Sequence, residues 1–267
     1  EVERDGAVGS TKVGRLFTNA RPGRILPPEA PKNPLDPGWH NGLPFREVFD
    51  YSYDGIMRSF EDSQQRMGTD SLDLLFVHDI GAVTHGDRNA GHWRALTSGG
   101  FRALEELREA GLIAGFGLGV NEWEVIAAAM DEVHLDCCLL AGRHSLLEQA
   151  AVPLLDRAHR QGTAVVIGGV FNSGILAAGA GGNVKFNYMD APADIVRRTE
   201  ALARSCAEFG VPLGAAAIQF PLSHPAVVSI LVGAKHPDRL RQSIAWFETE
   251  IPDGLWTTLR DKGLLAA

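Results

Sequence analysis

The sequence predicts an α/β fold in which parallel strands alternate with helices. Short apolar runs rich in Val, Ile and Leu recur along the chain, and segments with helical periodicity lie between them. Such runs are typical of strands that are buried on both faces, as in parallel sheets covered by helices. The chain has 267 residues, 45% of them hydrophobic, which suffices for one large core. We therefore expect a single domain over residues 1–267, with two small domains as the alternative.

Six runs are predicted to be the strands. They cover residues 7–13, 72–78, 113–120, 135–141, 164–170 and 227–233. The first helical segment follows Ser52, which can cap it, and Ile56, Phe60 and Met67 can share its buried face. Alternation of this kind favours parallel strands joined by helices.

Three further segments carry helix signals. Residues 100–111 have helical periodicity and end at a glycine. Asn121 and Glu124 have the spacing of a capping box, which predicts a helix capped by Asn121. Pro192 stands at a natural first-turn position of the last of these helices, which is predicted to stop at Gly210.

Two irregular segments are predicted to be loops. Residues 15–47 are rich in Pro and Gly and show no periodicity. A loop of that length inside a compact domain is usually functional, such as a lid or a binding loop. Residues 177–188 are predicted to be a shorter loop after the fifth strand.

The composition excludes several classes of function. The net charge is 25 − 33 = −8 and no run of Lys or Arg stands out, so nucleic acid is not expected as a partner. No apolar segment approaches the roughly 20 residues of a membrane span, and the N-terminus is charged, so we expect a cytoplasmic protein without membrane contact. Cys137, Cys138 and Cys206 have neither disulfide nor metal-ligand spacing and are interpreted as small buried side chains. No metal site is predicted.

Polar side chains follow the predicted strands, where parallel sheets collect their chemistry. Lys12 is the most unusual, because an ammonium beside a buried strand needs either a partner or a function. A structural ion pair is the alternative for Lys12. A single histidine at a strand end, such as His78, is more often structural than catalytic. Lys12, His78 and Asn121 would nevertheless point to one mouth of a parallel barrel.

Two glycine-rich turns are candidates for a nucleotide site. The glycines of "GFGLGVNEW" lie at 115, 117 and 119, which does not match the G-x-G-x-x-G spacing and disfavours a Rossmann site. The turn "GAKHPDRL" leads from a strand into a helix with Arg239 in its first turn, which suits a phosphate or a ribose. An ordinary helix start explains that turn equally well.

Taken together, these motifs resemble the aldo-keto reductase superfamily. "GSTKVGR", "LDLLFVHDIG" and "GFGLGVNEW" resemble its third, fourth and fifth barrel strands, and "LLAGRHSLLEQ", "VVIGGVFNSGILAAG" and the segment from "VGAKHPDRLRQSI" resemble the sixth to eighth. Within the family, the likeness is to the NAD(P)-dependent aldose 1-dehydrogenases, a branch that includes D-threo-aldose, L-galactose and pyridoxal dehydrogenases. The resemblance implies a (β/α)8 TIM barrel.

The resemblance also implies a role for each of the residues that match. Lys12 would lower the pKa of a catalytic tyrosine, His78 would orient the substrate oxygen, and Asn121 would bind the nicotinamide carboxamide. The other matches would hold the rest of the cofactor. Gly169, Phe171 and Ser173 would lie along its pyrophosphate and nicotinamide ring, and Gly233, Arg239 and Ser243 would lie at its adenosine end.

The nucleotide is expected to be NAD, with NADP as a possibility. Gly233 stands where many family members place a lysine on the 2′-phosphate, and losing that charge-assisted contact weakens the case for NADP. Gly168 stands where the usual stacking tyrosine would be, so Phe171 is expected to take over the packing on the ring.

The function implied is hydride transfer between an aldose, aldehyde or alcohol carbon and nicotinamide, of the type that gives a lactone. The partner would be a small sugar or aldehyde, and no particular oligomeric state is predicted. One alternative is a regulatory protein that binds NAD(P) on the same barrel without turnover. A less favoured alternative is a lyase that forms a Schiff base at Lys12.

The sequence departs from the family pattern at its start. The catalytic tyrosine and aspartate of the family come at the end of the second strand, before the lysine strand, but only "EVERDGAVG" precedes that strand here. We therefore expect the first two strand–helix units to be missing from this chain. Three explanations are open: the chain is the ordered part of a longer protein, it is a truncated product, or a partner chain supplies the missing units. "FDYSYDG" imitates the missing motif but follows Lys12 and enters a helix, so Tyr51 and Tyr53 are predicted to be packing residues.

Overall fold

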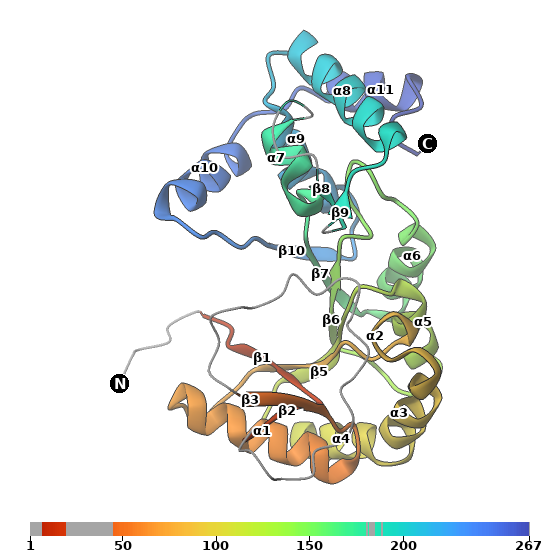
Figure 1. Cartoon of the computed structure of the whole chain (residues 1–267), viewed down its shortest axis with the longest axis vertical. Coiled ribbons are helices and arrows are strands. Elements are labelled where there is room, and N and C mark those ends of the chain that lie inside the picture. Colours follow the sequence, from red (N-terminus) through yellow and green to blue (C-terminus); the bar gives the residue numbers. More distant parts are fainter. Residues whose placement is uncertain (1–6, 20–44, 180, 182–184, 188, 267) are drawn as a thin grey trace. The chain divides into compact units, whose positions relative to one another are not determined.

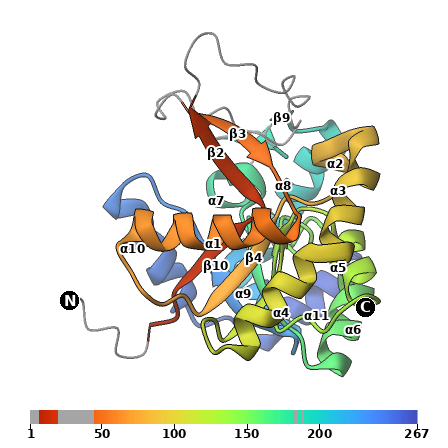
Figure 2. The same cartoon turned by 90° about the horizontal axis from the view of Figure 1, so that it is seen from below.

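The structure, a computed structural model, describes residues 7–19, 45–179, 181, 185–187 and 189–266. The chain forms two compact units, Glu1–Leu139 and Leu140–Ala267. The strand β6 (Cys137–Ala141) lies at their boundary. Figure 1 labels most helices and strands of both units, and Figure 2 also labels β4.

Three parallel strands form the centre of the first unit. They are β1 (Ser10–Val13), β4 (Leu74–His78) and β5 (Gly115–Val120), and β4 pairs with both of the others. Every residue of β5 is buried, as expected for a strand covered on both faces. The apolar runs therefore predicted these strands correctly, although each strand begins two or three residues later than its run.

Helices pack around these strands. Those of the first unit are α1 (Tyr53–Met67), α2 (Ala82–His85), α3 (Asn89–Ala95), α4 (Phe101–Glu109) and α5 (Trp123–Ala129), with a 3-10 turn at Gly86–Arg88 and a π-helical turn at Leu96–Gly100. The helices α1 and α4 lie side by side (Figure 1). The core of the unit is apolar and includes Val13, Tyr51, Ile56, Phe60, Leu75, Val77, Leu104, Leu107, Phe116 and Leu118.

The helix α1 begins where the sequence predicts, directly after Ser52. Ser52 is its N-cap, and the Ser52 hydroxyl accepts a hydrogen bond of 3.2 Å from the Gly55 N–H. Ile56 and Phe60 are buried as predicted. The prediction for Met67 is wrong, because its side chain lies in the last turn and is 48% exposed.

The predicted loop at residues 15–47 is wrong at both of its ends. The strands β2 (Arg15–Asn19) and β3 (Phe45–Phe49) pair in antiparallel fashion, as Figure 2 shows, while residues 20–44 lie outside the described part of the chain. Arg15 pairs with Glu47 across the two strands, and Phe17 contacts Phe45 with ring centroids 6.5 Å apart. Cross-strand pairs of this kind stabilise a two-stranded ribbon.

The predicted capping box at α5 is also wrong. The N-cap of this helix is Glu122 rather than Asn121, and it makes no side-chain capping bond. The Glu122 carboxylate instead accepts a hydrogen bond of 3.1 Å from the N–H of Val83, in the first turn of α2. A carboxylate at the start of a helix satisfies a free N–H and suits the helix dipole.

The second unit is built around β7 (Ala164–Gly168) and β10 (Val227–Leu231), which pair in parallel. The end of β6 lies beside β7, where the Gly142 N–H donates to the Gly168 carbonyl at 2.9 Å. The helices of the unit are α6 (Val152–Gln161), α7 (Ile175–Ala178), α8 (Ala193–Glu208), α9 (Leu213–Gln219), α10 (Pro237–Phe247) and α11 (Asp253–Asp261), with 3-10 turns at Asn172–Gly174 and Phe220–Ser223. In Figure 1, α8 and α11 run side by side.

The described part of the predicted loop at residues 177–188 has some regular secondary structure. It contains the end of α7 and the first strand of a short antiparallel pair, β8 (Lys185–Phe186) and β9 (Met189–Asp190). Pro192 is the N-cap of α8, one position before the predicted one, and Gly210 follows the helix with a φ of 69°. A positive φ there is typical of a helix end that uses glycine.

The core of the second unit is a cluster of aliphatic and small side chains. It includes Leu146, Leu147, Ile175, Leu176, Leu202, Cys206, Val211, Ala215, Ala216, Leu255 and Leu259. All three cysteines are free and buried, which confirms their interpretation as small core residues, and burial raises the pKa of Cys138 to about 12. No helix within the described ranges is long and apolar enough to cross a membrane.

Candidate active site

Three of the predicted site residues lie at the C-terminal ends of adjacent strands in the first unit. Lys12 is on β1, His78 is the last residue of β4, and Asn121 directly follows β5. His78 is paired with Gly119, and a Cβ atom at Gly119 would lie 3.6 Å from Cε of Lys12. The Lys12 stem therefore lies within van der Waals reach of Gly119, beside the strand that ends in His78.

His78 lies in an environment that keeps its imidazole neutral. Burial lowers its pKa, and the positive charges of Lys12 and Arg15 lower it further, to about 3. Its Nε2 atom is 3.3 Å from Oδ2 of Asp79. Because the pKa is far below 7, His78 can hydrogen-bond a substrate oxygen but does not act as a cationic acid at neutral pH.

Hydrogen bonds to its backbone hold the end of β4 in place. Asp79 has a φ of 51°, and its N–H donates to the Gly119 carbonyl at 3.1 Å. The Tyr51 hydroxyl donates to the His78 carbonyl at 2.7 Å and also lies 2.8 Å from Nε2 of His85. These bonds fix the backbone of the residue that carries the imidazole.

The two tyrosines of the "FDYSYDG" motif have structural roles, which confirms their interpretation as packing residues. Tyr51 is fully buried, and its burial raises its pKa well above the ordinary value near 10, so its phenol is protonated. The Tyr53 hydroxyl donates to the Glu106 carboxylate at 2.5 Å, and Arg102 lies over the Tyr53 ring. Neither phenol is suited to act as a base.

The first candidate cofactor residues of the second unit follow β7. Gly169 has a φ of 68°, and a Cβ atom there would lie 3.2 Å from the Gly142 nitrogen, so a glycine suits this tight turn. Phe171 is half-buried, with its ring 5.7 Å from that of Trp246 in an edge-on contact. Ser173 also has a positive φ, 59°.

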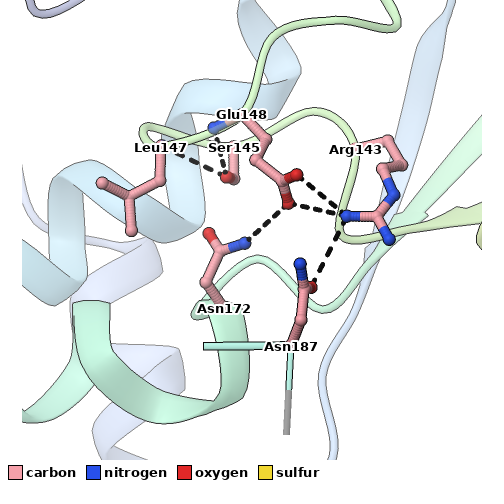
Figure 3. A network of polar contacts seen from close by, with 6 residues as sticks. All are labelled: Arg143, Ser145, Leu147, Glu148, Asn172 and Asn187. Atoms are coloured by element: carbon pink, nitrogen blue, oxygen red, sulfur yellow. Dashed lines mark hydrogen bonds and ion pairs between the residues drawn. The ribbon is translucent and has the colours of Figure 1, made fainter. Parts of the chain in front are cut away.

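A polar network joins the loop after β6 to the loop after β7 (Figure 3). Nη1 of Arg143 lies 2.9 Å from each oxygen of Glu148, and the Asn172 amide donates to the same carboxylate at 3.3 Å. Nη1 of Arg143 is also 3.5 Å from Oδ1 of Asn187. Arg143 and Glu148 both lie within the "LLAGRHSLLEQ" motif, and Asn172 lies within "VVIGGVFNSGILAAG".

The remaining predicted residues lie at the turn from β10 to α10. Gly233 is exposed, and no atom lies within 4 Å of the position that its Cβ would take. Arg239 is exposed in the first turn of α10, and Ser243 lies one turn further on, where its hydroxyl donates to the Arg239 carbonyl at 3.0 Å. The turn therefore offers open space beside a cation and a helix start.

The described part of the chain contains no group of three or more His, Cys, Asp or Glu side chains that could hold a metal ion.

The comparisons with known proteins identify the class. The model of the aldo/keto reductase family matches residues 1–263, so the chain belongs to this family. It is an oxidoreductase of the aldo-keto reductase type, and the family uses NAD(P)H. The parallel strands and alternating helices of both units are the α/β arrangement of the family's TIM barrel.

Individual members of the family show which enzymes the chain is similar to. The chain is 64% identical to pyridoxal 4-dehydrogenase from Microbacterium luteolum over 262 residues, which cover 97% of this chain and 77% of that enzyme. It is 36% identical to D-threo-aldose 1-dehydrogenase from a Pseudomonas species, over 98% of this chain and 76% of that enzyme. Among solved structures, the holo form of an aldo-keto reductase from Bacillus halodurans matches with a TM-score of 0.68 and 19% identity, covering all of this chain and 76% of the other.

Proposed function

We propose that the chain is an NAD-dependent dehydrogenase that oxidises pyridoxal, in its cyclic hemiacetal form, to a lactone. The observation that carries the proposal is the 64% identity to a pyridoxal 4-dehydrogenase along 97% of the chain. In pyridoxal, a hydroxymethyl group next to the aldehyde closes the hemiacetal ring. Its oxidation resembles that of the anomeric carbon of an aldose, which is the substrate named for the 36% identical relative.

Lys12 and His78 are the proposed catalytic residues. The reaction removes a hydride from the hemiacetal carbon and a proton from its hydroxyl group, and this leaves the carbonyl of the lactone. The neutral imidazole of His78 would hydrogen-bond the hemiacetal oxygen and orient it. The Lys12 ammonium would stabilise the anionic form of the group that takes the proton, because an opposite charge nearby favours ionisation. The resemblance assigns that proton to a tyrosine, and Tyr51 is too deeply buried for this role.

The residues present also fit a dinucleotide cofactor. Asn121 presents a half-buried side-chain amide at the end of β5, which suits a carboxamide. Gly169 gives an exposed backbone turn, and Arg239 gives a cation in the first turn of a helix. Bound NAD supplies the hydride acceptor. No cation occupies position 233 itself, which favours NAD over NADP.

A substrate panel tests the proposal. The protein is given NAD or NADP with pyridoxal, L-fucose or L-galactose, and reduction of the nicotinamide is followed by absorbance. We expect pyridoxal with NAD to give a kcat/KM at least about tenfold above that of either sugar, the size of discrimination that pocket contacts provide. Nucleotide binding is measured separately by fluorescence. Higher efficiency with a sugar would move the assignment to an aldose dehydrogenase, and NAD binding without any hydride transfer would favour a regulatory role.

A further inference from the structure

We propose that Glu148 is a positioning residue that holds the loop after β7 in the shape that binds the nucleotide. The inference rests on the proposed function, because Gly169, Phe171 and Ser173 of this loop are the residues that we assign to the cofactor. Glu148 itself lies in the loop after β6, and would act on the cofactor through Asn172.

The loop that carries Glu148 is closed by its own hydrogen bonds. The Ser145 hydroxyl accepts from the N–H groups of Leu147 and Glu148 at 3.2 and 3.1 Å, and the Ser145 N–H donates to the Glu148 carbonyl at 2.7 Å. Ser145 is fully buried. A turn that is satisfied internally in this way fixes the direction of the Glu148 side chain.

Glu148 is the partner that Arg143 and Asn172 share. Its carboxylate accepts from Arg143 and from the Asn172 amide, while both donors come from loops that follow different strands (Figure 3). Burial raises the pKa of Glu148, and the contacts with Arg143 and Asn172 lower it in part. The contacts with Arg143 and Asn172 therefore stabilise the ionised form of this half-buried carboxyl group.

The loop that receives the contact is conformationally strained. Asn172 and Ser173 have φ values of 44° and 59°, in the left-handed region that only glycine adopts at no cost. The Asn172 N–H donates to the Gly169 carbonyl at 2.9 Å, which closes the turn. Because Asn172 is buried and its amide is held by Glu148, the bond to Glu148 can maintain a turn that would otherwise relax.

The test uses Glu148→Gln, Asn172→Asp and the double variant. Glu148→Gln removes the carboxylate charge and leaves a weaker, neutral hydrogen bond to Asn172, whereas Asn172→Asp places a second carboxylate against the first. We therefore expect the Kd for NAD to rise about tenfold in Asn172→Asp and by a smaller factor in Glu148→Gln. In the double variant, the amide introduced at position 148 can donate to the carboxylate introduced at position 172, so we expect most of the affinity to return. Glu208→Gln is the matched control, because it breaks only the exposed ion pair with Lys262 in the same unit.

A second readout needs no nucleotide. Hydrogen exchange of the backbone amides of residues 169–176 should be faster in both single variants and slower again in the double variant, with the rest of the protein unchanged. An unchanged Kd and unchanged exchange in the single variants would overturn the role of Glu148 while the proposed function stands. If the unaltered protein binds neither NAD nor NADP, both proposals fail.

Discussion

At the residue scale, Tyr51 links the ends of the strands that carry Lys12 and His78. Its hydroxyl holds the His78 carbonyl, and its ring lies against Gly14, directly after β1, where a Cβ atom would come within 2.5 Å of Cδ1. Gly14 has a φ of 86°. Tyr51, which lies in the motif that imitates the family's catalytic one, thus helps to hold the two strand ends in place.

The substitution Tyr51→Phe tests this role. It keeps the ring but removes the hydrogen bond from the fully buried Tyr51 hydroxyl to the His78 carbonyl, so we expect the free energy of unfolding to fall by about 1 to 2 kcal/mol. We also expect kcat to fall more than the affinity for NAD. Tyr53→Phe is the control, because Tyr53 bonds to Glu106 at the surface, and it should leave both quantities unchanged. Chemical denaturation and steady-state kinetics measure the effects, and equal behaviour of the two variants would refute the role of Tyr51.

At the element scale, the turn between β10 and α10 is expected to set the choice of nucleotide. Gly233 has open space around its Cβ position, and its φ is not in the left-handed region, so a side chain can be added without strain. We expect Gly233→Lys to improve the affinity for NADP by about tenfold through a charge-assisted contact with the 2′-phosphate, and to leave that for NAD nearly unchanged. Titration of nucleotide fluorescence measures both constants. An equal gain for both nucleotides would show only a general charge effect.

The elements also show what the sequence could and could not predict. Six apolar runs located the parallel strands, since burial on both faces leaves a continuous hydrophobic signal. The pairing of β2 with β3 was missed, because it depends on contacts such as Arg15 with Glu47, which are 32 residues apart. The cap of α5 was placed one residue early, because the Glu122 carboxylate is engaged by Val83, a tertiary contact that no local pattern contains.

The same distinction applies to the candidate site. Lys12, His78 and Asn121 could be located because charged and polar residues at the ends of buried strands are unusual in sequence. Glu148 could not, because its contact with Asn172 joins residues 24 positions apart and requires the unusual backbone of Asn172. The neutral state of His78 was equally hidden, since it results from burial and from the charges of Lys12 and Arg15.

At the scale of the whole molecule, the family match over residues 1–263 and the 64% identity to a pyridoxal dehydrogenase support one chemistry for the chain. We propose that this chemistry is hydride transfer from the hemiacetal carbon of pyridoxal, assisted by Lys12. The substitution Lys12→Met retains most of the side-chain volume beside Gly119 and removes the charge.

The most direct measurement follows the hydride itself. Pyridoxal carrying deuterium at its aldehyde carbon is incubated with NAD and the protein, and the products are analysed by mass spectrometry. We predict that the deuterium appears in the reduced nicotinamide together with an equal amount of lactone, and that Lys12→Met lowers the rate by at least about a hundredfold while the Kd for NAD changes less than about twofold. Reduced nicotinamide without deuterium, or an unchanged rate in Lys12→Met, would contradict the account.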